Sequence, residues 1–307
     1  MNFSLEEITF IAVTFKSDKA ICNLLDTVPP LSKKIIIDNS EDYDLKEKLE
    51  KKYENTEVII SKNIGQGAGL NIGLKRSKTK FSFVLDPDVI FREDTFTKIS
   101  EAISKIEDFT IITPLNSNFK RPNYKIFKNK KFSFFEKKFY TRDVNLNNDI
   151  SNDIISVCRL DGYSLLLNME KFKDKIFFDE NFFLFRECTD LVLRVVKKKE
   201  KVYLIKNCLI DHLESKSSAS SIDNEVHYTR AWHWMWSKYY FNKKHLGILN
   251  ASIKIVFNIL TTFIELIKNY FQDKKGNVEI CKMRINGALN ALIGKKAWHR
   301  PNIRLTK

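Results

Sequence analysis

The sequence predicts an α/β protein with a mainly parallel sheet, covered by helices on both faces and followed by a helical tail. Short β-branched or aromatic runs alternate with longer stretches of helical spacing over the first two thirds of the chain. Because strands that alternate with helices are joined by right-handed crossovers, most of the strands are expected to be parallel. A long apolar stretch near the C-terminus predicts the tail.

Each predicted element has its own run in the sequence. Strands are expected at residues 8–15, 34–38, 57–61, 81–85 and 109–113, and then at 154–157, 163–167 and 202–205. Helices are expected around residues 17–27, 43–54, 67–78, 94–106 and 188–198. Residues 114–150 show little periodicity, which predicts a long loop or hairpin excursion near the ligand edge of the sheet.

The chain is expected to divide at a serine-rich junction. A domain spanning residues 1–215 comes before the run SKSSASS, and a basic, aromatic tail spans residues 216–307. Within the tail, aromatic and basic residues mix at 227–245. Helices are expected at 247–271 and 278–293.

The stretch 247–271 is long enough for a transmembrane helix, which needs about 20 apolar residues. Lys254, Asn258, Glu265 and Lys268 interrupt it, which favours a helix that lies in a membrane interface or packs on the domain. Aromatic residues before it fit a belt at the level of lipid headgroups or, equally, a buried cluster that joins the tail to the domain. These residues are Trp232, Trp234, Trp236, Tyr239 and Tyr240.

Composition excludes several classes of protein. The chain has 307 residues, 43% hydrophobic and 29% charged, which excludes a disordered or collagen-like protein. Its five cysteines include no C-x-x-C pair, so reduced thiols in the cytoplasm are expected. The acidic N-terminus differs from the basic start of a signal peptide. A net charge of +14 favours an anionic partner: nucleic acid, phospholipid or a phosphorylated substrate.

Two carboxylates follow the apolar run at 81–85. Asp86 and Asp88 flank Pro87 at the carboxyl end of a predicted strand, where open α/β sheets bind their ligands. Carboxylate oxygens suit a hard divalent cation that keeps positions open for phosphate oxygens. The pair is therefore a candidate site for Mg²⁺ or Mn²⁺, and the alternative is an ordinary Asp-Pro turn.

A glycine-rich segment opens the helix expected at 67–78. Gly65, Gly67 and Gly69 lie within residues 63–71, and free backbone amides at a helix start attract phosphate. The spacing is not that of a P-loop, because no G-K-[ST] follows. A tight structural turn is the alternative.

Two further acidic residues and one histidine are candidates for the site. Glu187 and Asp190 lie three apart at the start of a predicted helix, so they share a face and either is a candidate general base for a hydroxyl. The alternative is helix capping with an ion pair between Asp190 and Arg194. His212, which follows the last predicted strand, is a candidate to complete a metal site with Asp88 or to bind phosphate, and otherwise is structural.

These segments, in this order, resemble a family 2 glycosyltransferase of the GT-A fold, in particular its rhamnosyltransferase-like branch. The resemblance covers roughly residues 8–215. ITFIAVTFKS resembles the family's first strand with V-T-Y-N-S, and residues 36–40 resemble its V-D-N-S. Residues 63–71 resemble N-x-G-x-a-x-a-x-N, and Asp86-Pro87-Asp88 resembles D-x-D. FDENFFLFRECTDLVLR resembles F-D-E-x-F-F-x-Y-x-E-D-x-D-L-x-x-R, and Asp211-His212 resembles the family's histidine with its trailing loop.

The resemblance implies a role for each segment. Nucleotide contacts are implied for Thr14, Asp38, Asn63, Gly65, Gly67, Asn71 and Asp86. Metal ligation of Mg²⁺ or Mn²⁺ on the donor diphosphate is implied for Asp86, Asp88 and His212.

The sequence departs from the family at the catalytic base. Where the family commonly reads E-D-x-D, this chain reads Glu187-Cys188-Thr189-Asp190. A neutral thiol, with a reference pKa of about 8.5, replaces a carboxylate poorly at neutral pH. Glu187 is therefore the candidate base, with Asp190 in reserve.

The implied reaction is an inverting transfer of a hexosyl group from a nucleotide-diphosphate donor, such as dTDP-rhamnose or a UDP-sugar. The implied acceptor is a glycan or a lipid-diphosphate-linked glycan in bacterial surface polysaccharide synthesis, which places the protein in the cytoplasm or on the anionic inner face of the cell membrane. One rival is a degenerate scaffold that only binds nucleotide sugar, a reading that Cys188 favours. A sugar nucleotidyltransferase is the other, although residues 14–17 lack the glycine-rich loop it needs. Nucleic-acid binding is disfavoured, because the basic aromatic cluster lies in no recognisable module.

Overall fold

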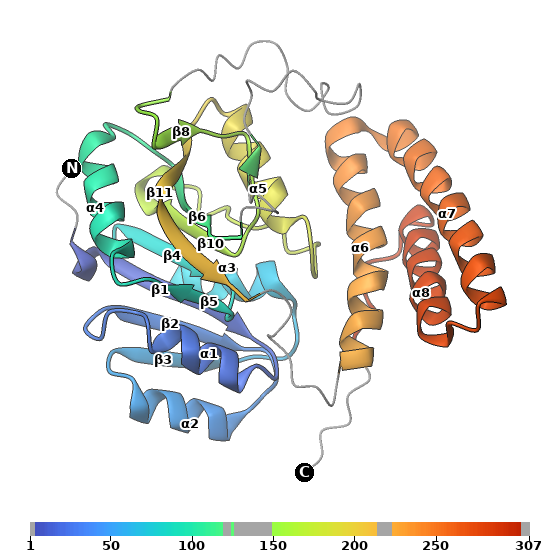
Figure 1. Ribbon diagram of the computed structural model, residues 1–307, viewed down its shortest axis with the longest axis horizontal. Helices are drawn as coiled ribbons and strands as arrows, with labels where there is room; N and C mark the ends of the chain where they lie inside the picture. Colours follow the sequence, from blue (N-terminus) through green and yellow to red (C-terminus); the bar gives the residue numbers. More distant parts are fainter. Residues whose placement is uncertain (1–3, 119–123, 126–148, 214–222, 302–307) are drawn as a thin grey trace. The chain divides into compact units, whose positions relative to one another are not determined.

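A computed structural model describes residues 4–118, 124–125, 149–213 and 223–301, and shows two compact units (Figure 1). The α/β unit comprises Met1–Asp179 and Cys188–Ser217, and the helical unit comprises Glu180–Glu187 and Ser218–Lys307. The predicted serine-rich junction and most of the predicted excursion at 114–150 lie outside the described residues.

The α/β unit is built on a nine-stranded sheet of order β3-β2-β1-β4-β10-β6-β11-β5, in which β8 also pairs with β11 (Figure 1). Its first four strands in the chain are parallel, as predicted: β1 (Ile8–Thr14), β2 (Lys33–Asp38), β3 (Thr56–Ile60) and β4 (Phe81–Leu85). The crossover helices are α1 (Asp18–Leu25), α2 (Tyr43–Lys52) and α3 (Gln66–Arg76).

The rest of the sheet mixes both directions. It contains β5 (Val89–Phe91), β6 (Ile111–Asn116), β8 (Ile154–Ser156), β10 (Ser164–Asn168) and β11 (Val202–His212). Strand β6 is parallel to β11, whereas β10 is antiparallel to β4 and β6, and β5 and β8 are antiparallel to β11. A separate two-stranded sheet pairs β7 (Tyr124–Lys125) with β9 (Arg159–Leu160).

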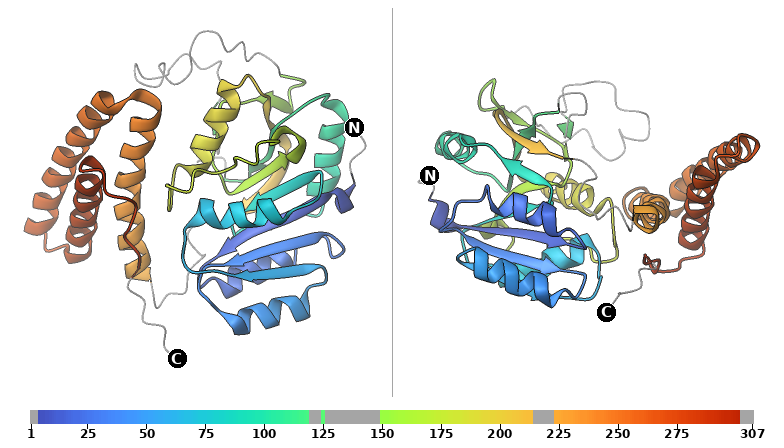
Figure 2. Two further views of the ribbon diagram at one scale, coloured as in Figure 1. Left: turned by 180° about the vertical axis from the view of Figure 1, so that it is seen from behind. Right: turned by 60° about the horizontal axis from the view of Figure 1, so that its bottom comes forward.

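Helices cover both faces of the sheet (Figure 2). Alternation along β1 sends Phe10 and Ala12 into one core with α1, α2 and α4 (Thr95–Lys105), and Ile11 and Val13 into a second core with α3 and α5 (Glu187–Lys197). The carboxyl ends of the parallel strands are thereby left at a single edge, which is where Thr14, Asp38 and Asp86 lie.

The helical unit consists of α6 (Asp223–Leu246), α7 (Ile248–Phe271) and α8 (Lys275–Leu292). Gly247, with φ of 84°, breaks the chain between α6 and α7. Trp232, Trp236 and Tyr239 are buried in the core of this unit, so of the two alternatives a buried cluster, not a belt at a membrane surface, describes these three residues. Their spacing of four and then three places them on one face of α6, and that face points inward.

Candidate active site

The acidic pair lies in a tight turn at the carboxyl end of β4. The Val89 amide donates to the Asp86 carbonyl at 3.3 Å, which closes the turn around Pro87 and leads directly into β5. The Asp88 side chain is buried, whereas Asp86 is partly exposed. The turn thus holds one buried carboxylate, Asp88, next to one that is partly accessible to solvent, Asp86.

His212 reaches this pair through strand pairing. In the antiparallel register of β11 and β5, His212 lies opposite Val89, the residue after Asp88. Its Nε2 atom lies 3.2 Å from Asp88 Oδ1 and 3.9 Å from Asp86 Oδ2. One ligand atom from each of the three side chains lies within 4.8 Å of the other two, so the fold assembles the predicted oxygen and nitrogen donor set.

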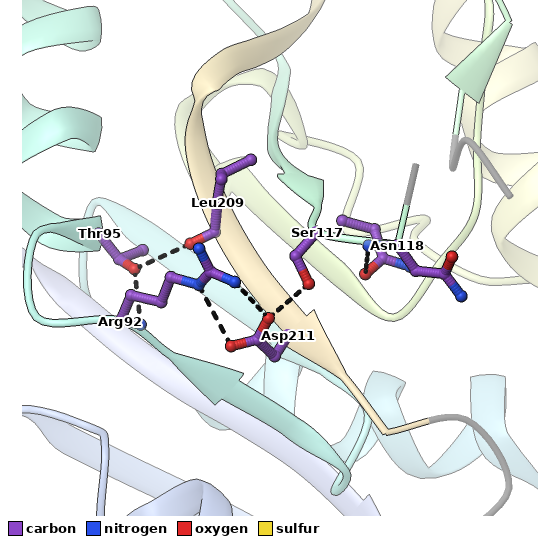
Figure 3. A network of polar contacts seen from close by, with 7 residues as sticks. Arg92, Thr95, Ser117, Asn118, Leu209 and Asp211 are labelled. Atoms are coloured by element: carbon purple, nitrogen blue, oxygen red, sulfur yellow. Dashed lines mark hydrogen bonds and ion pairs between the residues drawn. The ribbon is translucent and has the colours of Figure 1, made fainter. Parts of the chain in front are cut away.

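A polar network anchors the strand end that carries His212 (Figure 3). Arg92, just after β5, donates to Asp211 from both Nε and Nη2, at 3.2 and 2.7 Å, and the Ser117 hydroxyl also donates to Asp211 (Figure 3). These bonds, the Arg92 contact above all, hold the pKa of Asp211 below its usual value. Asp211 therefore ties β11 to the ends of β5 and β6, and its neighbour His212 is fixed beside the acidic pair.

Two residues that sequence reasoning missed contact the acidic and histidine ligands. The Tyr163 ring stacks on the His212 imidazole with centroids 4.3 Å apart and planes inclined by 14°. The Gln66 Nε2 atom, in the first turn of α3, donates to Asp86 Oδ1 at 2.9 Å. No sequence pattern marks either contact, because each depends on how separate elements pack in three dimensions.

The ends of β1 and β2 form the neighbouring part of the edge. Thr14 lies opposite Asp38, and the Asn39 amide donates to the Thr14 carbonyl at 2.9 Å. Asn39 Nδ2 donates to the Gly65 carbonyl at 3.2 Å, which links this part to the start of α3. Among the described residues, the buried Thr14 Oγ1 and Asn39 Oδ1 atoms have no hydrogen-bond partner. Such atoms are costly to leave unpaired, so they indicate a place for a polar ligand.

The Asp38 carboxylate accepts hydrogen bonds from residues of its own loop. It accepts from the Ser40 amide at 3.2 Å, the Ser40 hydroxyl at 2.5 Å and the Asp42 amide at 2.7 Å. Burial raises the pKa of Asp38 and outweighs these bonds. The nucleotide contact of Asp38 stays a prediction. In the same loop, the buried Oδ1 atom of Asn39, a residue that was not predicted, has no hydrogen-bond partner among the described residues.

The glycine-rich segment has a packing role that the sequence did not reveal. Gly65, the N-cap of α3, has a φ of 94°, which favours glycine. Cβ atoms on Gly69 and Gly73 would lie 2.8 Å from Val13 Cγ2 and 2.4 Å from Ile11 Cγ2, so the close packing of α3 against β1 depends on two residues without side chains. The Asn71 side chain donates to the Phe178 carbonyl and accepts from its amide, at 2.9 and 3.0 Å. Contacts of Asn63, Gly65, Gly67 and Asn71 with a nucleotide stay predictions.

The acidic residues of α5 have different surroundings. Asp190 is fully buried and pairs with Arg194 Nε at 2.8 Å. This is the ion pair expected under the alternative in which Asp190 is structural and not catalytic. Glu187 is buried as the first residue of α5 and is the last residue of the segment that belongs to the helical unit. Cys188 is buried against Gly162, where an added Cβ would lie 1.9 Å from the thiol sulfur. The position that carries an acid in the family thus holds a thiol packed against backbone.

The segment before Glu187 is held within the helical unit by α6. Phe182 packs edge-on against Tyr240, Phe183 contacts the ring of His233, and Ser237 Oγ donates to the Leu184 carbonyl at 2.7 Å. Phe185 and Arg186 both have positive φ, a strained conformation for residues with side chains. Side chains of α6 therefore hold the segment that leads into these two strained residues.

Comparisons with known proteins agree with this geometry. A family model described as Glycosyl transferase family 2 matches residues 18–161, which include Asp86 and Asp88. No curated protein sequence matches the chain.

Solved structures share the fold at low sequence identity. A Pyrobaculum calidifontis mannosyltransferase, in complex with GDP-Man and Mn²⁺, matches with a TM-score of 0.54 and 10% identity, covering 94% of this chain and 88% of that one. S. aureus TarS 1–349 in complex with UDP-GlcNAc matches with a TM-score of 0.50 and 15% identity, covering 94% and 92%. GalNAc-T7 with UDP, GalNAc and Mn²⁺ gives 0.51 and 13%, covering 74% and 50%.

This chain spans only 39% of the longer TarS chain. Identities of this size speak for the fold alone, whereas the family match covers the strands and turn that carry the acidic pair. The α/β unit therefore has the GT-A fold, and residues 18–161 of the chain match the model of glycosyl transferase family 2.

Proposed function

We propose that this protein is a metal-dependent, inverting glycosyltransferase that moves a sugar from a nucleotide-diphosphate donor to an acceptor hydroxyl. One observation carries the proposal: Asp86, Asp88 and His212 converge at the edge where Thr14 and Asn39 keep buried polar atoms without partners. A nucleotide diphosphate has the groups that such an edge needs, because its polar base and ribose complement the unpaired atoms and its phosphates complement a bound cation.

The donor set fits a hard divalent cation. Two carboxylates and one imidazole supply three oxygen and nitrogen ligand atoms, fewer than a hard divalent cation takes, which would leave positions for diphosphate oxygens. Asp86, Asp88 and His212 would hold Mg²⁺ or Mn²⁺. A bound cation supplies positive charge that offsets the charge developing on the leaving diphosphate.

The chain's own residues orient this set. Gln66 fixes Asp86 through the Asp86 Oδ1 atom, and Asp86 Oδ2 lies 3.9 Å from His212 Nε2. Tyr163 limits rotation of the imidazole by stacking on it. The first turn of α3 adds backbone amides beside Asp86, and these favour negative charge on the donor phosphates.

Transfer requires a base for the acceptor. In the proposed step the acceptor oxygen attacks the anomeric carbon and its proton passes to the Glu187 carboxylate. The bond from the anomeric carbon to phosphate breaks, and the nucleoside diphosphate leaves with the electron pair. Asp190 is the reserve base, with less support because it is buried and already paired with Arg194.

The proposed substrate classes follow from the resemblance of the sequence to family 2 glycosyltransferases. The proposed donor is a UDP-sugar or dTDP-rhamnose, and the proposed acceptor is a glycan or a lipid-diphosphate-linked glycan of a bacterial surface polysaccharide. The neighbours named above hold UDP-GlcNAc, UDP or GDP-Man, which supports a nucleotide-diphosphate donor in general. A cytoplasmic location, at the inner face of the membrane, completes the proposal.

A second candidate function is a nucleotide-sugar-binding protein without transferase activity. Cys188, buried against Gly162 at the position of a family acid, favours it. The two candidates agree on donor binding and differ in turnover.

The test uses purified full-length protein with Mn²⁺ and a panel of nucleoside diphosphates and nucleotide sugars. Thermal stabilisation by a matching nucleotide is expected for both candidates. Release of nucleoside diphosphate from the matching sugar donor by wild type, and its loss in Glu187→Gln with donor binding retained, is expected for the transferase alone. Stabilisation without turnover in the presence of acceptor glycans would favour the binding protein, and no stabilisation by any nucleotide would contradict both.

A further inference from the structure

Helix α7 has three faces along its length. Its inward face carries Ala251, Ile255, Thr262 and Asn269, which are buried in the helical unit. Its outer face is between 40% and 82% exposed and consists of Leu249, Ile253, Val256, Phe257, Leu260, Phe263, Ile264, Ile267 and Phe271. Lys254, Thr261, Glu265 and Lys268 follow at spacings of seven, four and three, so they form one polar edge beside the outer face.

This distribution is the reverse of that in a water-exposed helix. Polar groups on the inward side are bonded inside the unit: Lys238 Nζ donates to Asn258 Oδ1, and Thr262 Oγ1 donates to the Asn258 carbonyl, both at 2.7 Å. Of the 20 large hydrophobic side chains exposed in the described residues, 11 belong to α7. Because soluble proteins rarely expose an apolar patch of this extent, the outer face marks an interaction surface.

The surroundings of the outer face are positively charged. The described part of the tail, residues 223–301, has 13 lysines and arginines against five acidic residues. Glu265, the acidic member of the polar edge, pairs with Arg284 of α8 at 3.2 Å, and Lys254 and Lys268 lie on the same edge. An apolar face with a basic edge is complementary to lipid chains with anionic headgroups.

We propose that the outer face of α7 lies in the surface of an anionic lipid bilayer, with the helix axis parallel to the membrane plane. By length and composition α7 is the one described helix that could cross a membrane. A crossing would carry Lys254, Glu265 and Lys268 into the hydrocarbon, whereas a helix lying flat keeps this edge at the headgroups. A second copy of the chain is a poorer occupant, because it would bring two positively charged tails together.

The test is co-sedimentation of the full-length protein with vesicles of phosphatidylcholine, alone or mixed with phosphatidylserine. Affinity for the mixed vesicles is expected to be about tenfold higher or more at low salt, and to fall at high salt because headgroup attraction is screened. The double variant Phe257→Ser/Ile264→Ser is expected to lose about tenfold or more in affinity, because two of the most exposed apolar side chains of the outer face no longer insert.

A matched control removes equally exposed apolar side chains from the α/β unit. Leu31→Ser/Ile176→Ser, at positions 72% and 60% exposed, is expected to bind as wild type does. Circular dichroism establishes that both double variants keep their helices.

Three outcomes would overturn the proposal. Equal vesicle binding by wild type and Phe257→Ser/Ile264→Ser would show that the outer face does not meet lipid. A stable dimer in lipid-free buffer that this variant splits would assign the face to a second copy. Retention of the protein in vesicles after a high-pH carbonate wash would indicate a crossing helix. None of these readouts involves sugar transfer, so they stand apart from any failure of the proposed function.

Discussion

The two units of the protein differ in which side chains depart from the usual rule that apolar groups are buried and polar groups are exposed. In the α/β unit, polar side chains lie buried at one edge of an otherwise apolar core, with Thr14, Asn39 and Asp88 as the examples. In the helical unit, apolar side chains lie exposed along α7 over a partly polar interior. The buried polar side chains indicate a polar ligand for the α/β unit, and the exposed apolar side chains indicate an apolar neighbour for the helical unit.

The comparison requires that the interior of the helical unit is an ordinary close-packed core. Trp232 is fully buried and its Nε1 atom donates to Asn286 Oδ1 at 2.8 Å, whereas Trp234 is 44% exposed. Trp232→Ala should lower the free energy of unfolding by about 3–5 kcal/mol, and Trp234→Ala by less than about 1 kcal/mol. Urea unfolding measures both, and equal losses would break the comparison.

A corresponding test in the α/β unit concerns the contact between Gly162 and Cys188, the residue at the position of the family acid. Alanine at position 162 would place its Cβ 1.9 Å from Cys188 Sγ and 2.4 Å from Cys188 Cβ, so Gly162→Ala should cost about 3 kcal/mol of stability. Removing the opposing side chain in Gly162→Ala/Cys188→Gly should cost less than the two single changes together. Strict additivity in this double-mutant cycle would show that the two residues do not touch.

Acid should destabilise the helical unit through its buried histidine. Burial lowers the pKa of His233 from 6.5 to about 3, while Nε2 lies 2.8 Å from the His299 carbonyl oxygen. The unfolded chain binds a proton near pH 6.5 and the folded protein does not until about pH 3, so the free energy of unfolding falls as the pH drops below 6.5. Between pH 7 and 5 the loss should be about 2 kcal/mol.

His233→Gln should remove this part of the pH dependence, and His227→Gln, at an exposed position of α6, should leave it in place. Urea unfolding at pH 7 and at pH 5 compares the variants. If His233→Gln lost as much free energy of unfolding between pH 7 and pH 5 as the wild type does, the assignment to His233 would be contradicted.

The smallest effect is expected on the outer face of α7. Phe257 is 67% exposed, so Phe257→Ser should change the free energy of unfolding in lipid-free buffer by no more than about 0.5 kcal/mol. A loss comparable with that of Trp232→Ala would mean that this face is covered within the protein.

The sequence predicted those parts of the fold and site that depend on local pattern. Strand runs alternating with helices predicted β1 to β4 and their crossovers, and the strand-end rule predicted the acidic turn at Asp86. The antiparallel insertion of β10 was not predictable, because a short apolar run does not reveal its direction. Asn39, Gln66 and Tyr163 were missed for a related reason: their partners come from other elements. The orientation of α7 was left open as well, because an apolar helix face can pack inside a protein or lie in a membrane surface.

The central claim is that Asp86, Asp88 and His212 hold the cation through which the nucleotide sugar binds. The direct measurement is metal-dependent sugar transfer by wild type, Asp88→Asn and the exposed control Asp174→Asn, with Mn²⁺ binding followed by electron paramagnetic resonance. The account predicts that Asp88→Asn stays folded, loses bound Mn²⁺ and loses transfer by about 10³-fold, while Asp174→Asn behaves as wild type. Metal-dependent transfer at the wild-type rate in Asp88→Asn would contradict it.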